Sequence, residues 1–166
     1  MRLGPILAAA ALATLAAACN KSQPAAPAGG ETAAAPAAAP AASAEEKQKL
    51  LAALPAPYNA ADLDNGETKF GLCQSCHTIA PGGANMTGPN LHGVFGRKAG
   101  SNPDFKYSDA IKAAGFVWDG DHLNHWLENP QTFLPGTKMT FAGLKDPKDR
   151  TDLIAYLMVE TGHTAK

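Results

Sequence analysis

The sequence predicts an all-α domain of about four helices joined by long loops, preceded by an export signal and a tether. Three observations carry this prediction. Apolar residues recur at helical spacing in several segments after residue 58. No segment shows the alternation of apolar and polar residues that is typical of a half-buried strand. All aromatic residues except Tyr58 lie after that position, so only the later part of the chain can build a core.

The N-terminus has the pattern of an export signal. Arg2 precedes an uncharged run that ends in Ala16, Ala17 and Ala18, directly before Cys19. The run is shorter than the roughly 20 residues that a membrane-spanning helix needs. It resembles a bacterial lipoprotein signal, although Ala16 stands where that pattern usually has Leu, and the resemblance implies lipidation of Cys19 as the mature N-terminus. The alternative is ordinary cleavage with Cys19 unmodified. Residues 1–18 are thus assigned to an export signal peptide.

Residues 19–57 are assigned to an Ala/Pro-rich tether. Their many Ala, Pro, Gly and Ser residues do not build a packed core, and repeated prolines interrupt any helix. Residues 45–54 could form one or two amphipathic turns before Pro55 and Pro57 end them. The folded domain then comprises residues 58–166.

Within this domain the first two helices are short. Leu63, Gly66 and Phe70 recur at helical spacing after an acidic start, and Gly66 would let another helix cross closely. The Gly-rich stretch 81–100 predicts a loop. Residues 108–114 predict a second helix that ends before Gly115.

The last two predicted helices are residues 121–129, begun by Asp121 and ended by Pro130, and residues 148–161, with Leu153, Ile154, Leu157 and Met158 on one side. Large apolar residues are few for a domain of this size, and long loops bury little surface. Another group should therefore fill the centre of the domain.

The charge excludes an ordinary nucleic-acid partner. The formal net charge of the chain is −1. A basic surface that would attract a polyanion is not indicated. The chain has 3 Cys, an odd number, so at least one is outside any intrachain disulfide.

The most specific motif is Cys73-Gln74-Ser75-Cys76-His77. Two Cys at this spacing followed by His is the attachment pattern of c-type haem, in which both thiols form thioethers and His77 binds the iron. A thioredoxin-type dithiol would need a strand–turn–helix setting that the sequence lacks. A zinc site would need further ligands, and His122 with His125 more often form a solvated helix face.

Met139 is the favoured second iron ligand. It follows Pro135 and Gly136, which can turn the loop inward, whereas Met86 and Met158 are weaker candidates. A thioether opposite His77 would raise the reduction potential and close the sixth position to substrates.

Several further stretches resemble class I cytochrome c of the mitochondrial and alphaproteobacterial type. The resemblance covers essentially residues 59–166 and implies the class I cytochrome c fold, with about four helices wrapped around one covalently bound haem c. The signal and tether resemble the membrane-anchored bacterial forms. The stretches that carry the resemblance are 87–98 (TGPNLHGVFGRK), 127–130 (LENP), 135–139 (PGTKM), 141–143 (FAG) and 152–157 (DLIAYL).

The resemblance also implies roles around the haem. The carbonyl of Pro89 would orient His77, and Phe141 would flank the exposed haem edge. Haem propionates would be held by side chains that can donate hydrogen bonds. Arg97, Tyr107 and Trp118 match the residues at one propionate, and Thr137 matches the hydroxyl at the other.

Three departures from the family pattern stand out. Trp126 replaces the usual Tyr near the Met sulfur, and Ile111 replaces a polar residue. Leu72 and Gln131 occupy positions that are often basic, which leaves a thin lysine ring of Lys98, Lys106 and Lys138. A tethered carrier needs less electrostatic steering, because the tether raises its local concentration.

The resemblance implies a monohaem electron carrier, not an enzyme, that takes electrons from quinol:cytochrome c oxidoreductase to a haem-copper terminal cytochrome c oxidase. We expect a monomer, lipid-anchored on the periplasmic side of a bacterial membrane, with a soluble periplasmic form as the alternative. The competing functions are a peroxidase-like or gas-sensing haem protein with five-coordinate iron, and a structural subunit of a larger oxidase. A bound Met139 would argue against the former.

Overall fold

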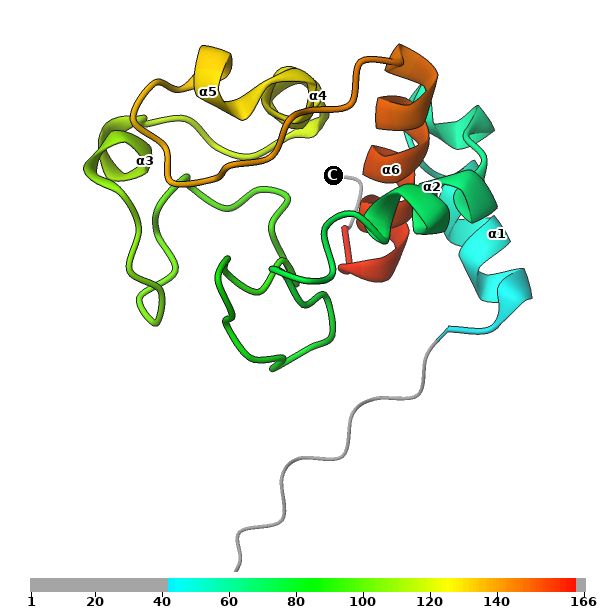
Figure 1. Ribbon diagram of the computed structural model, residues 1–166. Coiled ribbons are helices and arrows are strands. Elements are labelled where there is room, and N and C mark those ends of the chain that lie inside the picture. The colour runs from blue at the N-terminus through cyan, green and yellow to red at the C-terminus, as the bar shows by residue number, and fades with distance from the viewer. Residues whose placement is uncertain (1–41, 164–166) are drawn as a thin grey trace, which may run out of the picture. The chain divides into compact units, whose positions relative to one another are not determined.

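A computed structural model describes residues 42–163, so the predicted signal peptide, Cys19 and most of the predicted tether lie outside the described residues. Within this range the chain is helical, with an isolated bridge between Lys98 and Val117 and no strand. The all-α prediction is confirmed. None of the described helices is both long and apolar enough to cross a membrane. In chain order (Figure 1), the elements are α1 (Ala44–Ala52), the 3₁₀ helix η1 (Tyr58–Ala60), α2 (Leu63–Phe70), α3 (Asp109–Ala113), α4 (Gly120–Glu128), α5 (Pro130–Phe133) and α6 (Pro147–Glu160).

The central element is α6, which begins with Asp146 as N-cap and Pro147 in its first turn. Residues 152–159 are all buried, whereas the sequence pattern predicted a one-sided apolar face. The difference arises because α1, α2 and α4 all pack against α6. The predicted close crossing at Gly66 is confirmed. A Cβ there would lie 2.6 Å from Cβ of Tyr156 and overlap the carbonyl oxygen of Asp152.

Two helix boundaries differ from the prediction. Helix α4 begins at Gly120 because the Asp119 carboxylate, not that of Asp121, caps it and accepts a hydrogen bond from the amide of His122 at 2.8 Å. Pro130 ends α4 but also begins α5, which Asn129 caps through the amide of Thr132. Proline suits this position because its missing N–H has no partner in a first helical turn. These short helices raise the number above the predicted four.

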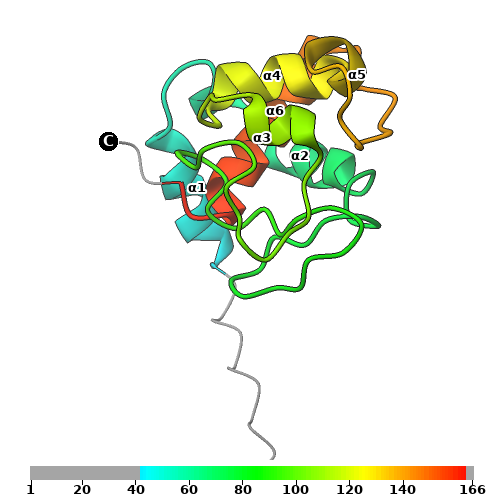
Figure 2. The same cartoon turned by 90° about the vertical axis from the view of Figure 1, so that its left-hand side faces the viewer.

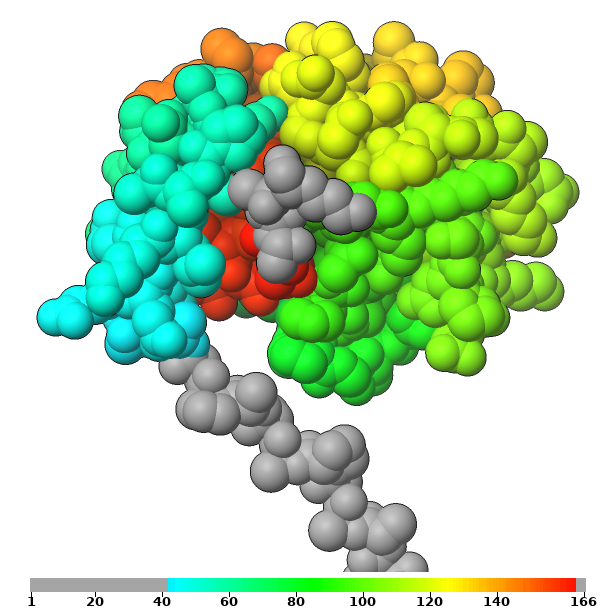
Figure 3. Space-filling model, turned by 180° about the vertical axis from the view of Figure 1, so that it is seen from behind, coloured from blue at the N-terminus to red at the C-terminus, as the bar shows by residue number. Residues whose placement is uncertain are grey.

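Helix α1 lies in the segment that we assigned to the end of the tether. Ser43 and Glu46 form a capping box at its start. Leu51, Leu54 and Tyr58 are buried in the core cluster of the domain. The two possible helical turns predicted for residues 45–54 are therefore a helix, and Figure 3 shows it, in cyan, beside the red C-terminal end of α6. Residues of the segment assigned to the tether therefore contribute to the core of the described domain.

The region between α2 and α3 contains no helix, and Figure 2 shows it in green on the side of the domain away from α4 and α5. Side-chain amides fix its shape. Asn90 donates to Oγ1 of Thr78 at 2.6 Å and to the carbonyl of Ala80 at 3.0 Å, and its own N–H donates to Oδ1 of Asn85 at 2.8 Å. These bonds hold the loop that forms one wall of the site described next.

Candidate haem-binding site

A cavity of about 400 Å³ lies between the long loop region, α3, α4, α6 and the loop after α5. This volume is within the range of sites for small molecules and cofactors. Every described residue predicted for the site lines this cavity. Leu72, Ile111 and Trp126, three of the residues that differ from the family pattern, line it too. The predicted residues are Cys73, Cys76, His77, Pro89, Arg97, Tyr107, Trp118, Thr137, Met139 and Phe141.

The Cys-x-x-Cys-His motif forms a turn that directly follows α2. The amides of Cys76 and His77 both donate to the carbonyl of Cys73, at 3.0 and 2.9 Å. Burial, and secondarily the neighbouring Cys76, raises the pKa of the Cys73 thiol to about 11. A thioredoxin-type dithiol needs a lowered thiol pKa. Together with the lack of any strand in residues 42–163, this pKa argues against the dithiol alternative.

The His77 ring is fixed from two directions. Its Nδ1 lies 2.8 Å from the carbonyl oxygen of Pro89, which can only accept, so the proton is on Nδ1. Gly88 lies against the ring. A Cβ at this position would overlap Cε1 of His77 and lie 2.6 Å from Nε2. Burial lowers the pKa of His77, with the Pro89 hydrogen bond opposing it. The ring therefore stays neutral and keeps the Nε2 lone pair for a metal.

The loop after α5 brings Met139 to the cavity. The Gln131 side-chain amide donates to the carbonyls of Met139 at 2.7 Å and Thr137 at 3.2 Å, and the amide of Met139 donates to Oγ1 of Thr137 at 3.3 Å. Among the described methionines, Met139 alone lines the cavity. Met86 is 48% exposed on the surface, whereas Met158 is buried in the core.

Gln131 has a role at the site that its sequence pattern does not indicate. It was singled out only as an uncharged residue at an often basic position, whereas the structure shows its amide bracing the Met139 loop. The sequence signal closest to this role is that Gln131 directly follows Pro130, a residue that favours the first turn of a helix close to the loop that carries Met139. His122 and His125 lie on α4 outside the cavity, and His122 stacks on Phe116.

The charged side chains on the otherwise largely apolar cavity wall are all cationic. Arg97, Lys106 and Lys138 line it, and no Asp or Glu does so. The guanidinium of Arg97 donates to the carbonyls of His92 and Asn90, both at 3.2 Å, and forms no ion pair within residues 42–163. Burial raises the pKa of Tyr107, with the Arg97 charge opposing, so this hydroxyl remains a neutral donor. A charged wall without acidic partners fits a group that carries carboxylates, and the two propionates of haem supply them.

A helical fold around a largely apolar cavity, with a Cys-x-x-Cys-His turn and a neutral imidazole at its wall, defines a c-type haem protein. Comparison with known proteins agrees. The Cytochrome c family matches residues 63–159.

Individual relatives are similar over the same region. Cytochrome c of Cochliobolus lunatus is 54% identical over 105 residues, which cover 63% of this chain and 97% of the relative. Cytochrome c2 of Rhodomicrobium vannielii is 48% identical over 105 residues, covering 63% and 84%. The solved structure of cytochrome cH from Methylobacterium extorquens superimposes with a TM-score of 0.55 at 44% identity, covering 58% of this chain and 97% of that one.

The chain belongs to the cytochrome c family. It is a class I c-type cytochrome, a monohaem electron carrier with one covalently bound haem c.

Proposed function

We propose that the haem is attached through Cys73 and Cys76, that His77 and Met139 bind its iron, and that the protein carries respiratory electrons from a quinol:cytochrome c oxidoreductase to a haem-copper terminal oxidase. When bound, the haem supplies a single reversible one-electron couple. The observation that carries this proposal is that Met139 is the one described methionine at a cavity also lined by the neutral imidazole of His77.

The remaining residues position the group and exclude water. The Pro89 carbonyl fixes the orientation of His77 and increases its basicity as a ligand. Arg97, Tyr107 and Trp118 hold one propionate, and Thr137 holds the other. Their presence on the wall of one cavity supports these roles. Phe141 covers the exposed haem edge. A bound Met139 closes the sixth position of the iron to substrates, which supports a carrier rather than an enzyme.

The protein acts as a monomer held on the periplasmic side of a bacterial membrane by lipid on Cys19. Residues 1–18 are the export signal, and the tether that begins at Cys19 gives way to the folded domain near residue 43. Intact-mass analysis of the exported protein tests the anchor. Lipid mass at the mature N-terminus is expected, together with release from membranes in Cys19→Ala. A mature N-terminus without lipid mass means a soluble periplasmic carrier.

We take the surface around Leu72, at the edge of the cavity, as the face that meets redox partners. Leu72 is 59% exposed there, at a position where a basic residue is common, so this face carries little charge. We therefore expect rates with the oxidase to fall only gently as salt is raised. A fall as steep as that of a strongly basic homologue contradicts this part of the proposal. Stoichiometric co-purification with an oxidase would instead favour a structural subunit.

The ligand set is tested by Met139→Ala, with Met86→Ala as the matched control on the surface. Loss of the thioether should abolish the methionine–iron charge-transfer band of the oxidised protein and lower the midpoint potential, because a thioether ligand raises it. Met86→Ala should retain both. If Met139→Ala also retains both, Met139 is not the ligand. If the unmutated protein lacks the band, five-coordinate iron and an enzymatic or gas-sensing role become the better reading.

A further inference from the structure

The segment 43–58, which we call the N-terminal clamp, lies before the residues that the Cytochrome c family matches. It is nevertheless built into the domain. A capping box fixes the start of α1. At its end, Leu51, Leu54 and Tyr58 have no more than 9% of their surface exposed and belong to the same hydrophobic cluster as α4 and α6. A segment that served only as the end of a tether would have no reason to bury three large side chains.

The first part of the clamp holds α6. Lys47 of α1 forms an ion pair with Glu160, the last residue of α6, at 2.6 Å, and both side chains are mostly covered. Helix α1 and η1 both contact α6. These contacts fix the clamp to the helix that supplies Leu157 to the cavity wall.

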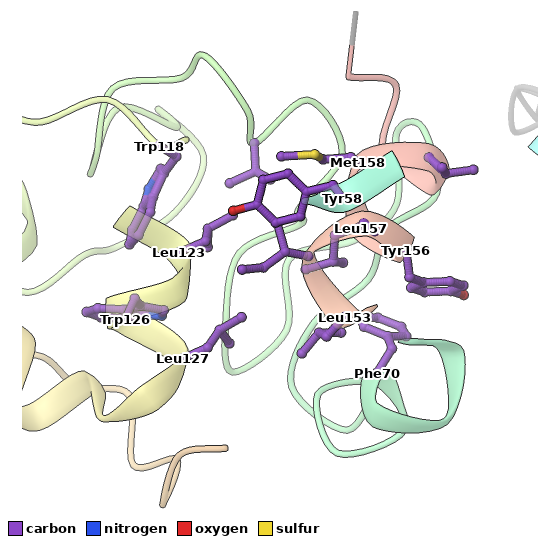
Figure 4. Packing of buried hydrophobic residues seen from close by; sticks show 14 of the residues in the cluster. Tyr58, Phe70, Trp118, Leu123, Trp126, Leu127, Leu153, Tyr156, Leu157 and Met158 are labelled. Atoms are coloured by element: carbon purple, nitrogen blue, oxygen red, sulfur yellow. The ribbon is translucent and has the colours of Figure 1, made fainter. Parts of the chain in front are cut away.

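The end of the clamp reaches α4. Tyr58 lies against Gly120, the first residue of α4, so closely that a Cβ there would overlap the phenol oxygen and lie 2.7 Å from Cζ. In Figure 4 the Tyr58 ring lies between Leu123 of α4 and the side chains of Leu157 and Met158 on α6. Tyr58 therefore fills the junction at the start of α4, where α4 packs against α6, and both helices contribute walls to the cavity.

Helix α4 carries a large part of that wall, since Leu123, Trp126 and Leu127 all line the cavity. Any change in the separation of α4 and α6 moves these side chains against the haem. We propose that the N-terminal clamp is a positioning element for the haem pocket, in which Tyr58 sets the separation of α4 and α6 and so controls the fit of the pocket around the haem and the retention of the Met139 ligand. The part concerning Met139 rests on the proposed function above.

The test compares Tyr58→Ala, Tyr58→Phe and Phe70→Leu in the haem-loaded full chain. Phe70 is buried between α2 and α6 but does not line the cavity, so Phe70→Leu reports destabilisation alone. The readouts are amide hydrogen exchange in α4, the midpoint potential, and the rate at which added imidazole displaces the methionine ligand. Tyr58→Ala should accelerate exchange in α4 and displacement by at least about fivefold over Phe70→Leu, and should shift the potential. Tyr58→Phe, which keeps the ring, should behave as the unmutated protein.

Equal exchange in α4 for Tyr58→Ala and Phe70→Leu overturns the proposal. Faster exchange with unchanged potential and displacement also overturns it, because the clamp would then only stabilise the fold. If the unmutated protein shows no methionine–iron band, the proposed ligation fails independently. Exchange in α4 and the potential then decide the clamp without the displacement assay.

Discussion

The contact between Gly88 and His77 makes a quantitative prediction for Gly88→Ala. The added Cβ would overlap Cε1 of His77 and lie 2.6 and 2.7 Å from Nε2 and Nδ1, whereas unstrained carbon contacts are about 3.5–4.0 Å. The ring must therefore move by about 1 Å. That movement breaks the 2.8 Å hydrogen bond from Nδ1 to the Pro89 carbonyl.

Overpacking of this kind costs about 1–3 kcal/mol, and the lost hydrogen bond adds about 1 kcal/mol. A combined loss of about 2–4 kcal/mol should lower the unfolding temperature of the haem-loaded protein by about 10 °C, because a domain of this size loses roughly 4 °C per kcal/mol. With His77 as the proposed iron ligand, the midpoint potential should change as well, since the orientation of a ligating imidazole tunes the iron.

Thermal unfolding followed at the haem absorbance, together with a potentiometric titration, measures both effects. The matched control is Gly82→Ala in the same loop region. Gly82 has a positive φ of 67°, which strains any other residue, but an added Cβ there meets no atom within 4 Å. It should therefore lose about 1 kcal/mol from backbone strain and leave the potential unchanged. If Gly88→Ala unfolds within about 2 °C of this control and keeps the potential, the reasoning about the His77 ring is refuted.

Three further predictions concern other parts of the domain. Although burial alone would raise the pKa of Asp152, hydrogen bonds from Lys148 and two other N–H donors hold it below its usual value. The ionised Asp152 carboxylate therefore stabilises the fold above the unfolded pKa of about 3.9, and this stabilisation is lost as pH falls through the lower folded pKa. Asp152→Asn removes the titrating group, so the unfolding free energy measured in denaturant titrations should depend less on pH below about pH 4. Gln131→Ala removes the 2.7 Å donor to the Met139 carbonyl and should accelerate displacement of Met139, the proposed ligand, by imidazole about fivefold in stopped-flow measurements. An unchanged rate contradicts the bracing role. Arg97→Gln removes a positive charge from the cavity wall. The oxidised haem, which is more positive than the reduced haem, is then repelled less, so the midpoint potential should fall. An unchanged potential in a potentiometric titration would show that the Arg97 charge does not act on the haem iron.

Local signals in the sequence predicted the helices with clear periodicity and caps. Leu63, Gly66 and Phe70 marked α2 and its crossing with α6, because a glycine on an apolar stripe has a direct geometric meaning. The Cys-x-x-Cys-His motif has few alternative interpretations, so it alone named Cys73, Cys76 and His77. The residues of the haem environment were named from the resemblance to class I cytochrome c, and the structure brings both sets to one cavity.

What the sequence pattern missed depends on contacts between distant segments. The continuous burial of residues 152–159 in α6 follows from packing by α1, α2 and α4, which periodicity within one helix cannot reveal. The bracing of Met139 by Gln131 depends on where the loop after α5 returns. The role of Tyr58 was hidden because Pro55 and Pro57 suggested the end of structure, whereas the chain resumes against α4 directly after them.

The cavity has a consequence for how the polypeptide acquires its native state. The cavity is lined largely by apolar side chains and opens to solvent, so without haem its wall faces water. Apolar surface left in water forfeits about 25 cal/mol per Å², and the whole stability of a typical domain is only about 5–15 kcal/mol. The chain without haem is therefore expected to remain largely unfolded, so that haem attachment and folding form one thermodynamic event. Thioether formation then makes that event irreversible, and a polypeptide that misses its haem is left as a substrate for proteases.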